Sequence, residues 1–284
     1  MTLWWGPRVL PLLYLNSLLS IPLWGLDWRW APLYAVPETL GVAMAWGLCR
    51  LRPVDPALPF LRHLVRFMLF GVLLALVPVA IGVQSNLWLS GHLPSHSLLS
   101  AILTLWLADS LMTLAVAIPL LTYLTPWLQR RGWLNSPLAK RREPVPAALR
   151  QWPAWPLLLA LVLGMPWLLE LLPLSLNLPL IGVMMLSLAL VWGYVGAICG
   201  ATLSALMVLI LPLLRGLTDT AAWLDPQRLE LHFGVLLFML ASLMVGRALS
   251  DLRQSLARSA RTQQQLALAN LALEASSLGV IIAD

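Results

Sequence analysis

The sequence predicts an all-α fold: a polytopic transmembrane bundle of about eight helical spans, followed by a cytoplasmic coiled-coil helix. Of the 284 residues, 60% are hydrophobic and only 11% are charged, and the mean hydropathy is +0.83. A soluble domain carries roughly 45–50% apolar and about 25% charged residues. Several apolar runs approach the roughly 20 residues that cross a hydrocarbon core. These runs do not alternate apolar and polar residues, so helices are predicted rather than barrel strands.

The apolar runs define the expected spans of a membrane domain over residues 1–247. The sixth and seventh spans are separated only by the short stretch Trp192-Gly193-Tyr194. The expected spans are 8–26, 32–49, 62–82, 97–124, 155–172, 178–193, 195–214 and 229–247.

Lysine and arginine are distributed unevenly between the loops of this arrangement. With a cytoplasmic N-terminus, the outside loops hold only Arg29, Arg215 and Arg228, and all other basic residues lie inside. The positive-inside rule then predicts a multi-pass protein of the bacterial inner membrane with both termini in the cytoplasm. The net charge of +6 is explained by this topology, so we expect the lipid bilayer as partner and no nucleic acid.

After the last expected span, an apolar stripe continues with spacings of three and four residues over 248–273. Such a heptad register is typical of a coiled coil. Because the stripe is about 36 Å long and narrow, we expect a homodimer through this helix. The alternative is an amphipathic helix lying on the bilayer. The register comprises Leu249, Leu252, Leu256, Ser259, Gln263, Leu266, Asn270 and Leu273, and its leucines are the candidate signal-relay residues.

The segment 274–284 differs from the heptad helix. Residues 280–283 have the composition of a buried strand, with Asp284 beginning a turn. We therefore expect a further cytoplasmic domain to start within 274–284.

Four segments resemble, in order, the type-one membrane-associated sensor domain, or MASE family. Leu15-Asn16 resembles an Ala-Asn pair in an early span, and Glu38-Thr39 resembles an Asn-Thr-Leu-Glu-Ala region. The run "LVRFMLFGVLLALVP" resembles an Arg-Phe span with a later proline. Trp106, Asp109 and Pro119 resemble a Trp…Gly-Asp-x-x-Gly…Pro signature. The resemblance covers roughly residues 8–247.

The sequence differs from the family pattern in two places, and its C-terminal segment is similar to a second domain type. Ala108 and Met112 stand where the family usually has glycine. The family's Trp-Pro-Pro-Ala-Gly-like segment would precede residue 1, together with about two further spans. The tail "LEASSLGVIIAD" is similar to the opening of a PAS domain.

The resemblance implies a sensory input module that responds to an unknown small-molecule stimulus. Members of the family precede diguanylate cyclase or cyclic-di-GMP phosphodiesterase domains, and also histidine kinases. The output expected here is of the cyclic-di-GMP kind first and a histidine kinase next.

Glu38 and Asp109 are the carboxylates deep inside predicted spans. A charge at the bilayer centre costs at least about 2.5–3.5 kcal/mol, so each should face the interior, be paired or be protonated. One interpretation is a ligand- or proton-sensing pocket, which Trp106 joins through the resemblance. The alternative is a polar lock between helices. The further expected neighbours are Asn16, Thr104 and Ser110.

No catalytic motif, cofactor site or metal site is predicted, so we do not expect this chain to be an enzyme by itself. Cys49 and Cys199 are interpreted as packing residues. His92 and His96 flank Pro94, which breaks the helical spacing that a metal would need. Two other classes stay open. A transporter would show discontinuous spans in two related halves, and a membrane-embedded enzyme would need more clustered polar residues.

Overall fold

The computed structural model describes residues 2–21, 27–94, 97–134, 164, 174–210 and 226–281. Within this part of the chain every regular element is a helix and no strand is present, which confirms the all-α prediction. The expected span 155–172 lies outside the described residues, apart from Gly164.

Three of the described helical segments are long and apolar enough to cross a membrane, which suggests a membrane protein. They coincide with the third, fourth and last expected spans. Two shorter apolar helices, Leu176–Trp192 and Tyr194–Leu209, coincide with the sixth and seventh. The three long segments are Leu61–Leu89, Leu98–Arg130 and Leu229–Glu274.

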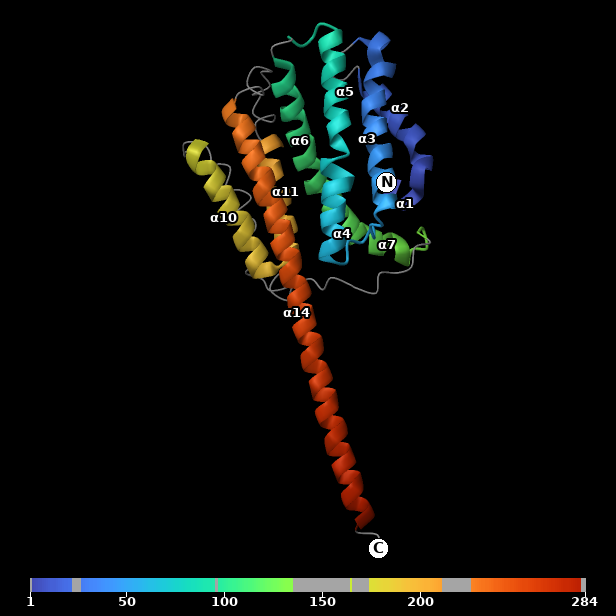
Figure 1. Cartoon of the computed structure of the whole chain (residues 1–284), viewed down its shortest axis with the longest axis vertical. Helices are drawn as coiled ribbons and strands as arrows, with labels where there is room; N and C mark the ends of the chain where they lie inside the picture. The colour runs from blue at the N-terminus through green and yellow to red at the C-terminus, as the bar shows by residue number, and fades with distance from the viewer. Residues whose placement is uncertain are drawn as a thin grey trace.

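The N-terminal elements form one side of the bundle, where α3 lies between α2 and α5 (Figure 1). Close approach of α3 to α5 depends on Gly82, because an added Cβ there would lie 2.7 Å from the ring of Pro37. The elements are α1 (Thr2–Trp5), the 3₁₀ helix η1 (Gly6–Val9), α2 (Leu10–Ser20), the 3₁₀ helix η3 (Trp28–Trp30) and α3 (Ala31–Leu51).

Two long helical segments follow, and π-helical turns interrupt both. In the first segment, Pro78 cannot donate a backbone hydrogen bond, and the helix is interrupted by a turn at residues 74–75 just before it. The second carries α6, which packs on both sides of the bundle. The elements are α4 (Leu61–Arg66), η4 (Phe67–Leu73), α5 (Leu76–Leu89), α6 (Leu98–Pro119), η6 (Leu120–Leu124) and α7 (Thr125–Arg130).

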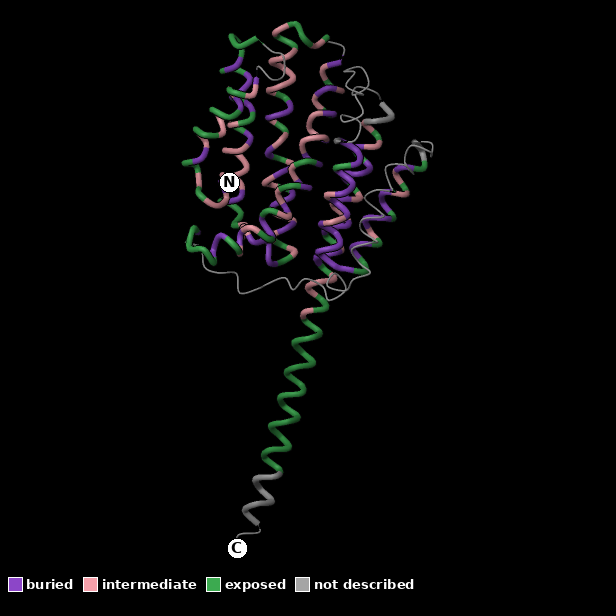
Figure 2. The backbone as a smooth tube through the Cα atoms, turned by 180° about the vertical axis from the view of Figure 1, so that it is seen from behind, coloured by how far each residue is buried: buried purple, intermediate pink, exposed green. Residues whose placement is uncertain are grey.

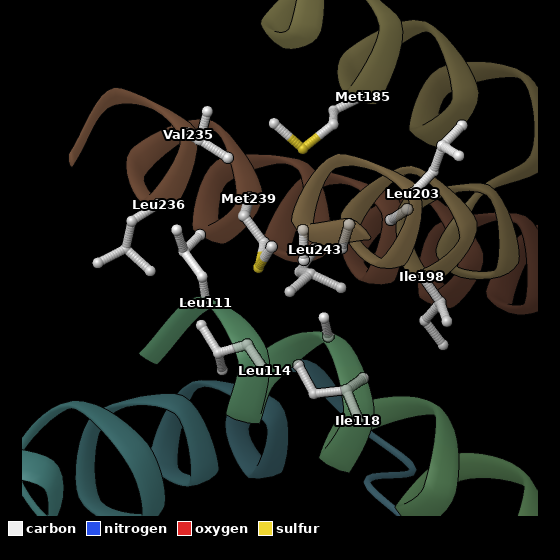
Figure 3. Packing of buried hydrophobic residues seen from close by; sticks show 14 of the residues in the cluster. Leu111, Leu114, Ile118, Met185, Ile198, Leu203, Val235, Leu236, Met239 and Leu243 are labelled. Atoms are coloured by element: carbon white, nitrogen blue, oxygen red, sulfur yellow. The ribbon is translucent and has the colours of Figure 1, made fainter. Parts of the chain in front are cut away.

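The C-terminal elements pack as three neighbouring helices, of which α11 and α14 also pack against α6. They are α10 (Leu174–Trp192), α11 (Tyr194–Ala205) with the π-helical turn η7 (Leu206–Ile210), and α14 (Pro226–Ile281). Gly193 separates α10 from α11 at φ +64°, a conformation that glycine adopts without strain. The apolar core lies between these helices, where Leu114 and Ile118 of α6 face Met239 and Leu243 of α14 (Figure 3).

The helix α14 is continuous over 56 residues and leaves the bundle at one end (Figure 1). We call residues 252–281 the shaft; at 1.5 Å per residue this segment is about 45 Å long. Its side chains are exposed from Ser255 through Glu274, whereas the part of α14 inside the bundle is largely buried or half-buried (Figure 2).

Several arginine-bearing helix ends meet where α14 leaves the bundle. Loop 52–60, between α3 and α4, accepts a hydrogen bond from Thr125 of α7 at Pro56 and one from Arg247 of α14 at Pro59. Arg50 lies in the last turn of α3, on one flank of this loop, whereas Arg29 lies next to the other end of α3. Arginines that the sequence assigns to one side of a membrane thus share one end of the bundle.

The strand expected to begin at Val280 is wrong for the described residues, because α14 continues as helix through Ile281. A single strand has no partner for its backbone groups, whereas a helix closes its hydrogen bonds within the segment. Residues 282–284 lie outside the described part.

Replacement of Gly196 by alanine should destabilise the bundle. The turn at Gly193 brings α11 so close to α10 that an added Cβ at Gly196 would lie 1.9 Å from the Leu188 carbonyl oxygen. Backbone must then move, and we expect the free energy of unfolding to fall by about 2 kcal/mol or more. Thermal unfolding of the detergent-purified chain, followed by tryptophan fluorescence, measures the loss.

Gly47→Ala is the matched control, because an added Cβ at Gly47 of α3 meets no atom within 4 Å. Alanine in a helix interior is favoured over glycine by roughly 0.5–1 kcal/mol, so this variant should equal or exceed the wild type. Equal melting temperatures for both variants would contradict the packing of α10 on α11.

Candidate functional site

Glu38 is paired with a hydroxyl group and lies toward the outside of the bundle. The Ser17 hydroxyl of α2 donates to the Glu38 carboxylate of α3. Ser17 is buried, whereas the Glu38 residue as a whole is exposed. Of the three expected alternatives for Glu38 (facing the interior, being paired or being protonated), the structure shows an exposed residue with a hydrogen bond from Ser17.

Asp109 lies half-buried on α6. Within the described chain no side chain donates a hydrogen bond to the Asp109 carboxylate. Thr104 does not donate to the Asp109 carboxylate, because the Thr104 hydroxyl donates to the Ser100 carbonyl of its own helix at 2.8 Å. The Ser110 hydroxyl is buried and has no hydrogen-bond partner in the described part. Within the described residues the two carboxylates therefore do not form a shared hydrogen-bonded cluster.

Asn16 and Trp106 do not join Glu38 in a pocket. Asn16 is exposed on α2, and the adjacent Ser17 makes the contact that was expected of it. Trp106 donates its indole N–H to the Leu73 carbonyl at 2.9 Å, at the break between η4 and α5. Its observed contact thus satisfies a backbone oxygen at an irregular part of the helix.

Arg247, a residue that the sequence assigned only to the cytoplasmic flank, contacts several separate groups in the described part of the chain. Its side chain is fully buried where α14 leaves the bundle. The guanidinium carbon lies 4.8 Å from the centre of the Tyr194 ring. The same group donates to the Pro59 carbonyl and to Asp251 Oδ1, the latter at 3.1 Å. Burial of a charge is tolerated when it is paired and hydrogen-bonded in this way.

The partners of Arg247 belong to both sides of the bundle. Pro59 lies in the loop between α3 and α4, and Tyr194 begins α11. The Tyr194 hydroxyl is 3.3 Å from the Thr122 hydroxyl of η6. The Asp251 carboxylate also accepts from the Leu61 backbone N–H at the start of α4, at 3.3 Å.

Two further side chains of α14 attach to the turn between α10 and α11. Ser250 accepts the Tyr194 backbone N–H at 2.9 Å. Arg253 donates to the Leu190 and Val191 carbonyls at 2.8 and 3.3 Å. These carbonyls lie in the last turn of α10, where a cation also interacts favourably with the helix dipole. We call Arg247, Ser250, Asp251 and Arg253, with the groups they contact, the exit cluster.

The relay heptad begins at the exit cluster. Leu249 is half-buried there, and the other heptad leucines stand exposed on the shaft. In the single chain these exposed leucines are Leu252, Leu256, Leu266 and Leu273.

The remaining candidates for metal or thiol chemistry are separated from one another. Cys49 is buried and Cys199 is half-buried, and neither forms a disulfide. His92 Nδ1 is 2.9 Å from the Ser90 hydroxyl, and His96 lies outside the described residues. The described residues contain no group of three or more metal-binding side chains.

A scan against protein-family models, a search of curated proteins and a search of solved structures found no match.

Ser17→Ala should weaken the attachment of α2 to α3. The substitution removes the hydroxyl that donates a hydrogen bond to the Glu38 carboxylate. We expect this loss to lower the free energy of unfolding by about 1–2 kcal/mol. Unfolding of the purified chain in detergent measures it. Asn16→Ala, one residue earlier on the exposed face, is the matched control and should stay within about 0.5 kcal/mol of the wild type. Equal losses in the two variants would contradict the Ser17–Glu38 contact.

Proposed function

We propose that this chain is a membrane-embedded sensory input module of a bacterial signal-transduction protein. In this proposal a change in the bundle moves α14, which passes the change to a cytoplasmic output domain. The observation that carries the proposal is the continuity of α14, whose single 56-residue helix is part of the bundle core and also forms the exposed shaft.

The exit cluster supports a relay. A ligand can shift a protein only between states for which it has different affinities, so a sensor needs a bistable element. Arg247 contacts the loop before α4 and the start of α11 at once. A displacement of either group of helices therefore changes the contacts that hold the base of the shaft.

The exposed leucines support a parallel homodimer. Leu256 and Leu266 are 62% and 59% exposed, although they belong to a regular apolar stripe. Such a stripe is stable in water when a second helix covers it. A second copy of the chain would supply that helix with the same heptad register.

The stimulus is proposed to act through the polar residues of α2, α3 and α6. Ser17, Glu38 and Asp109 belong to three different helices. A proton or a small polar molecule that neutralised Glu38 would weaken its hydrogen bond from Ser17 and remove its repulsion of another carboxylate. This assignment retains Glu38 and Asp109 as sensing residues and replaces Asn16 by Ser17.

The output domain is proposed from the sequence resemblance alone: a diguanylate cyclase or phosphodiesterase first, and a histidine kinase next. The orientation, with both termini in the cytoplasm of an inner membrane, rests on the positive-inside rule. The gathering of arginines at the end where the shaft begins is consistent with that orientation.

The transporter alternative is less well supported. The helix break at residues 74–75 is the kind of interruption at which transporters expose carbonyl groups to an ion. Here Trp106 already donates to the Leu73 carbonyl at the break. Transport also gives no role to the shaft.

A fusion protein tests the relay. The full chain is joined at its C-terminus to a diguanylate cyclase domain that is active only when two copies meet. Duplication of residues 256–262 inserts seven residues and preserves the heptad phase, whereas duplication of 256–259 inserts four and shifts it. We expect cyclic-di-GMP synthesis in membranes to survive the first insertion and to fall at least about tenfold with the second.

Cysteine at Leu256 or at Leu266 provides the control for dimerisation, because either should crosslink between copies in the same membranes. Equal synthesis with both insertions would contradict a relay through helix phase. Crosslinks at exposed shaft positions outside the heptad, with none at the heptad leucines, would contradict the dimer.

A further inference from the structure

Seven arginines in the described part of the shaft end form two groups by their contacts. One group is engaged with the protein backbone: Arg66 donates to the Pro53 carbonyl, Arg130 to Pro126, and Arg247 and Arg253 to the carbonyls described above. The second group comprises Arg50, Arg62 and Arg131, which lie over aromatic rings instead.

The three guanidiniums of the second group have the same arrangement on three separate elements. The guanidinium carbon of Arg50 lies 5.3 Å from the centre of the Trp46 ring in α3. Arg62, in the first turn of α4, lies 5.4 Å from the Phe60 ring. Arg131, directly after α7, lies 5.1 Å from the Trp127 ring.

These three arginines are exposed, and none donates a side-chain hydrogen bond to a residue in the described part of the chain. An aromatic ring covers one face of a guanidinium and fixes its plane, while the N–H groups remain at the edge. A planar set of N–H donors matches the oxygen atoms of a phosphate.

The acidic residues at this end of the described structure are already engaged. Asp55 Oδ1 accepts the Ala57 backbone N–H at 2.9 Å, and Asp251 pairs with Arg247. Within the described residues, none of Arg50, Arg62 and Arg131 forms an ion pair with a carboxylate.

The depth of the three arginines suits a lipid headgroup. Arg62 and Arg131 lie within one residue of the ends of apolar segments long enough to cross a membrane. Arg50 lies in the last turn of the 21-residue α3. Tryptophan and arginine at such positions are typical of the membrane–water interface.

We infer that Arg50, Arg62 and Arg131, each stacked on its aromatic ring, form a binding surface for the phosphate groups of anionic phospholipids. This surface would make the bundle select anionic over zwitterionic lipids at the end where the shaft emerges. The inference requires membrane insertion but does not depend on the sensory function.

Native mass spectrometry of the detergent-purified full chain tests the inference. The protein is incubated with equimolar phosphatidylglycerol and phosphatidylcholine, and the ratio of bound lipids is measured. We expect the wild type to prefer phosphatidylglycerol about tenfold or more, and R50Q/R131Q to lower that ratio at least about fivefold.

R258Q/R261Q is the matched control, because it removes the same charge from the exposed shaft, about 16–21 Å along α14 from Arg247. Its ratio should equal that of the wild type. R50K/R131K keeps the charge and should retain a preference for phosphatidylglycerol. Excess inorganic phosphate should leave the ratio unchanged, because a lipid also contacts the apolar helices.

Three results would overturn the inference. The wild type could bind both lipids equally, which would exclude selection whatever the variants do. R258Q/R261Q could lose as much preference as R50Q/R131Q, which would indicate a response to total charge. Displacement of phosphatidylglycerol by inorganic phosphate would indicate a site for the free anion.

Discussion

The structure depends on the burial of one cation, Arg247, at the point where α14 leaves the bundle. A fully buried guanidinium is costly unless its charge and its N–H groups are engaged. Here Nη2 of Arg247 donates to the Pro59 carbonyl and to Asp251, and the Tyr194 ring lies against the guanidinium. Tyr194 and Pro59 come from other parts of the chain than α14, whereas Asp251 lies one turn further along α14 itself. Because a buried charge that loses its partners is costly, these contacts hold the start of α11 and the loop before α4 against α14. Separation of either of these two segments from α14 would remove a contact that the buried charge needs.

Close helix packing gives this cluster its fixed geometry. Gly246 of α14 faces the turn at Gly193, and an added Cβ at Gly246 would lie 2.6 Å from the Ala197 side chain. The missing side chains allow α14 to approach the hairpin of α10 and α11 closely enough for Ser250 and Arg253 to reach it. One turn further along, the side chains of α14 become exposed. Within a few residues, α14 thus changes from a packed core helix to the exposed shaft. A displacement of the packed part of α14 would therefore be passed to the shaft rather than taken up by flexible chain between them.

Much of the fold could be predicted from the sequence because lipid-spanning helices need long apolar runs. The hairpin at Trp192-Gly193-Tyr194 and the three long apolar segments follow from composition and from one glycine. The contacts of Arg247 could not be predicted in this way, because an arginine after a span also serves as a topology signal. Only the packing of α14 against the other helices distinguishes the buried Arg247 from the exposed Arg258.

The candidate sensing residues show a similar division. Glu38 and Asp109 stand out because carboxylates are rare in apolar runs, but the structure pairs Glu38 with Ser17 rather than with Asp109. Choosing Ser17 over Asn16 needs the rotation of α2 relative to α3, since adjacent helical residues point about 100° apart. The strand predicted to begin at Val280 is wrong because a short β-branched run fits a strand or a helix equally well. The environment of the segment decides between the two.

Hydrogen exchange of the full chain in nanodiscs tests the central claim, that Arg247 fastens the shaft to the bundle. In R247M we expect the backbone amides of residues 248–256 to exchange at least about tenfold faster than in the wild type, because the base of the shaft loses its anchor. Protection within α6 should be preserved, and R258M should match the wild type. Unchanged exchange at 248–256 in R247M, or an equal acceleration in R258M, would contradict the account.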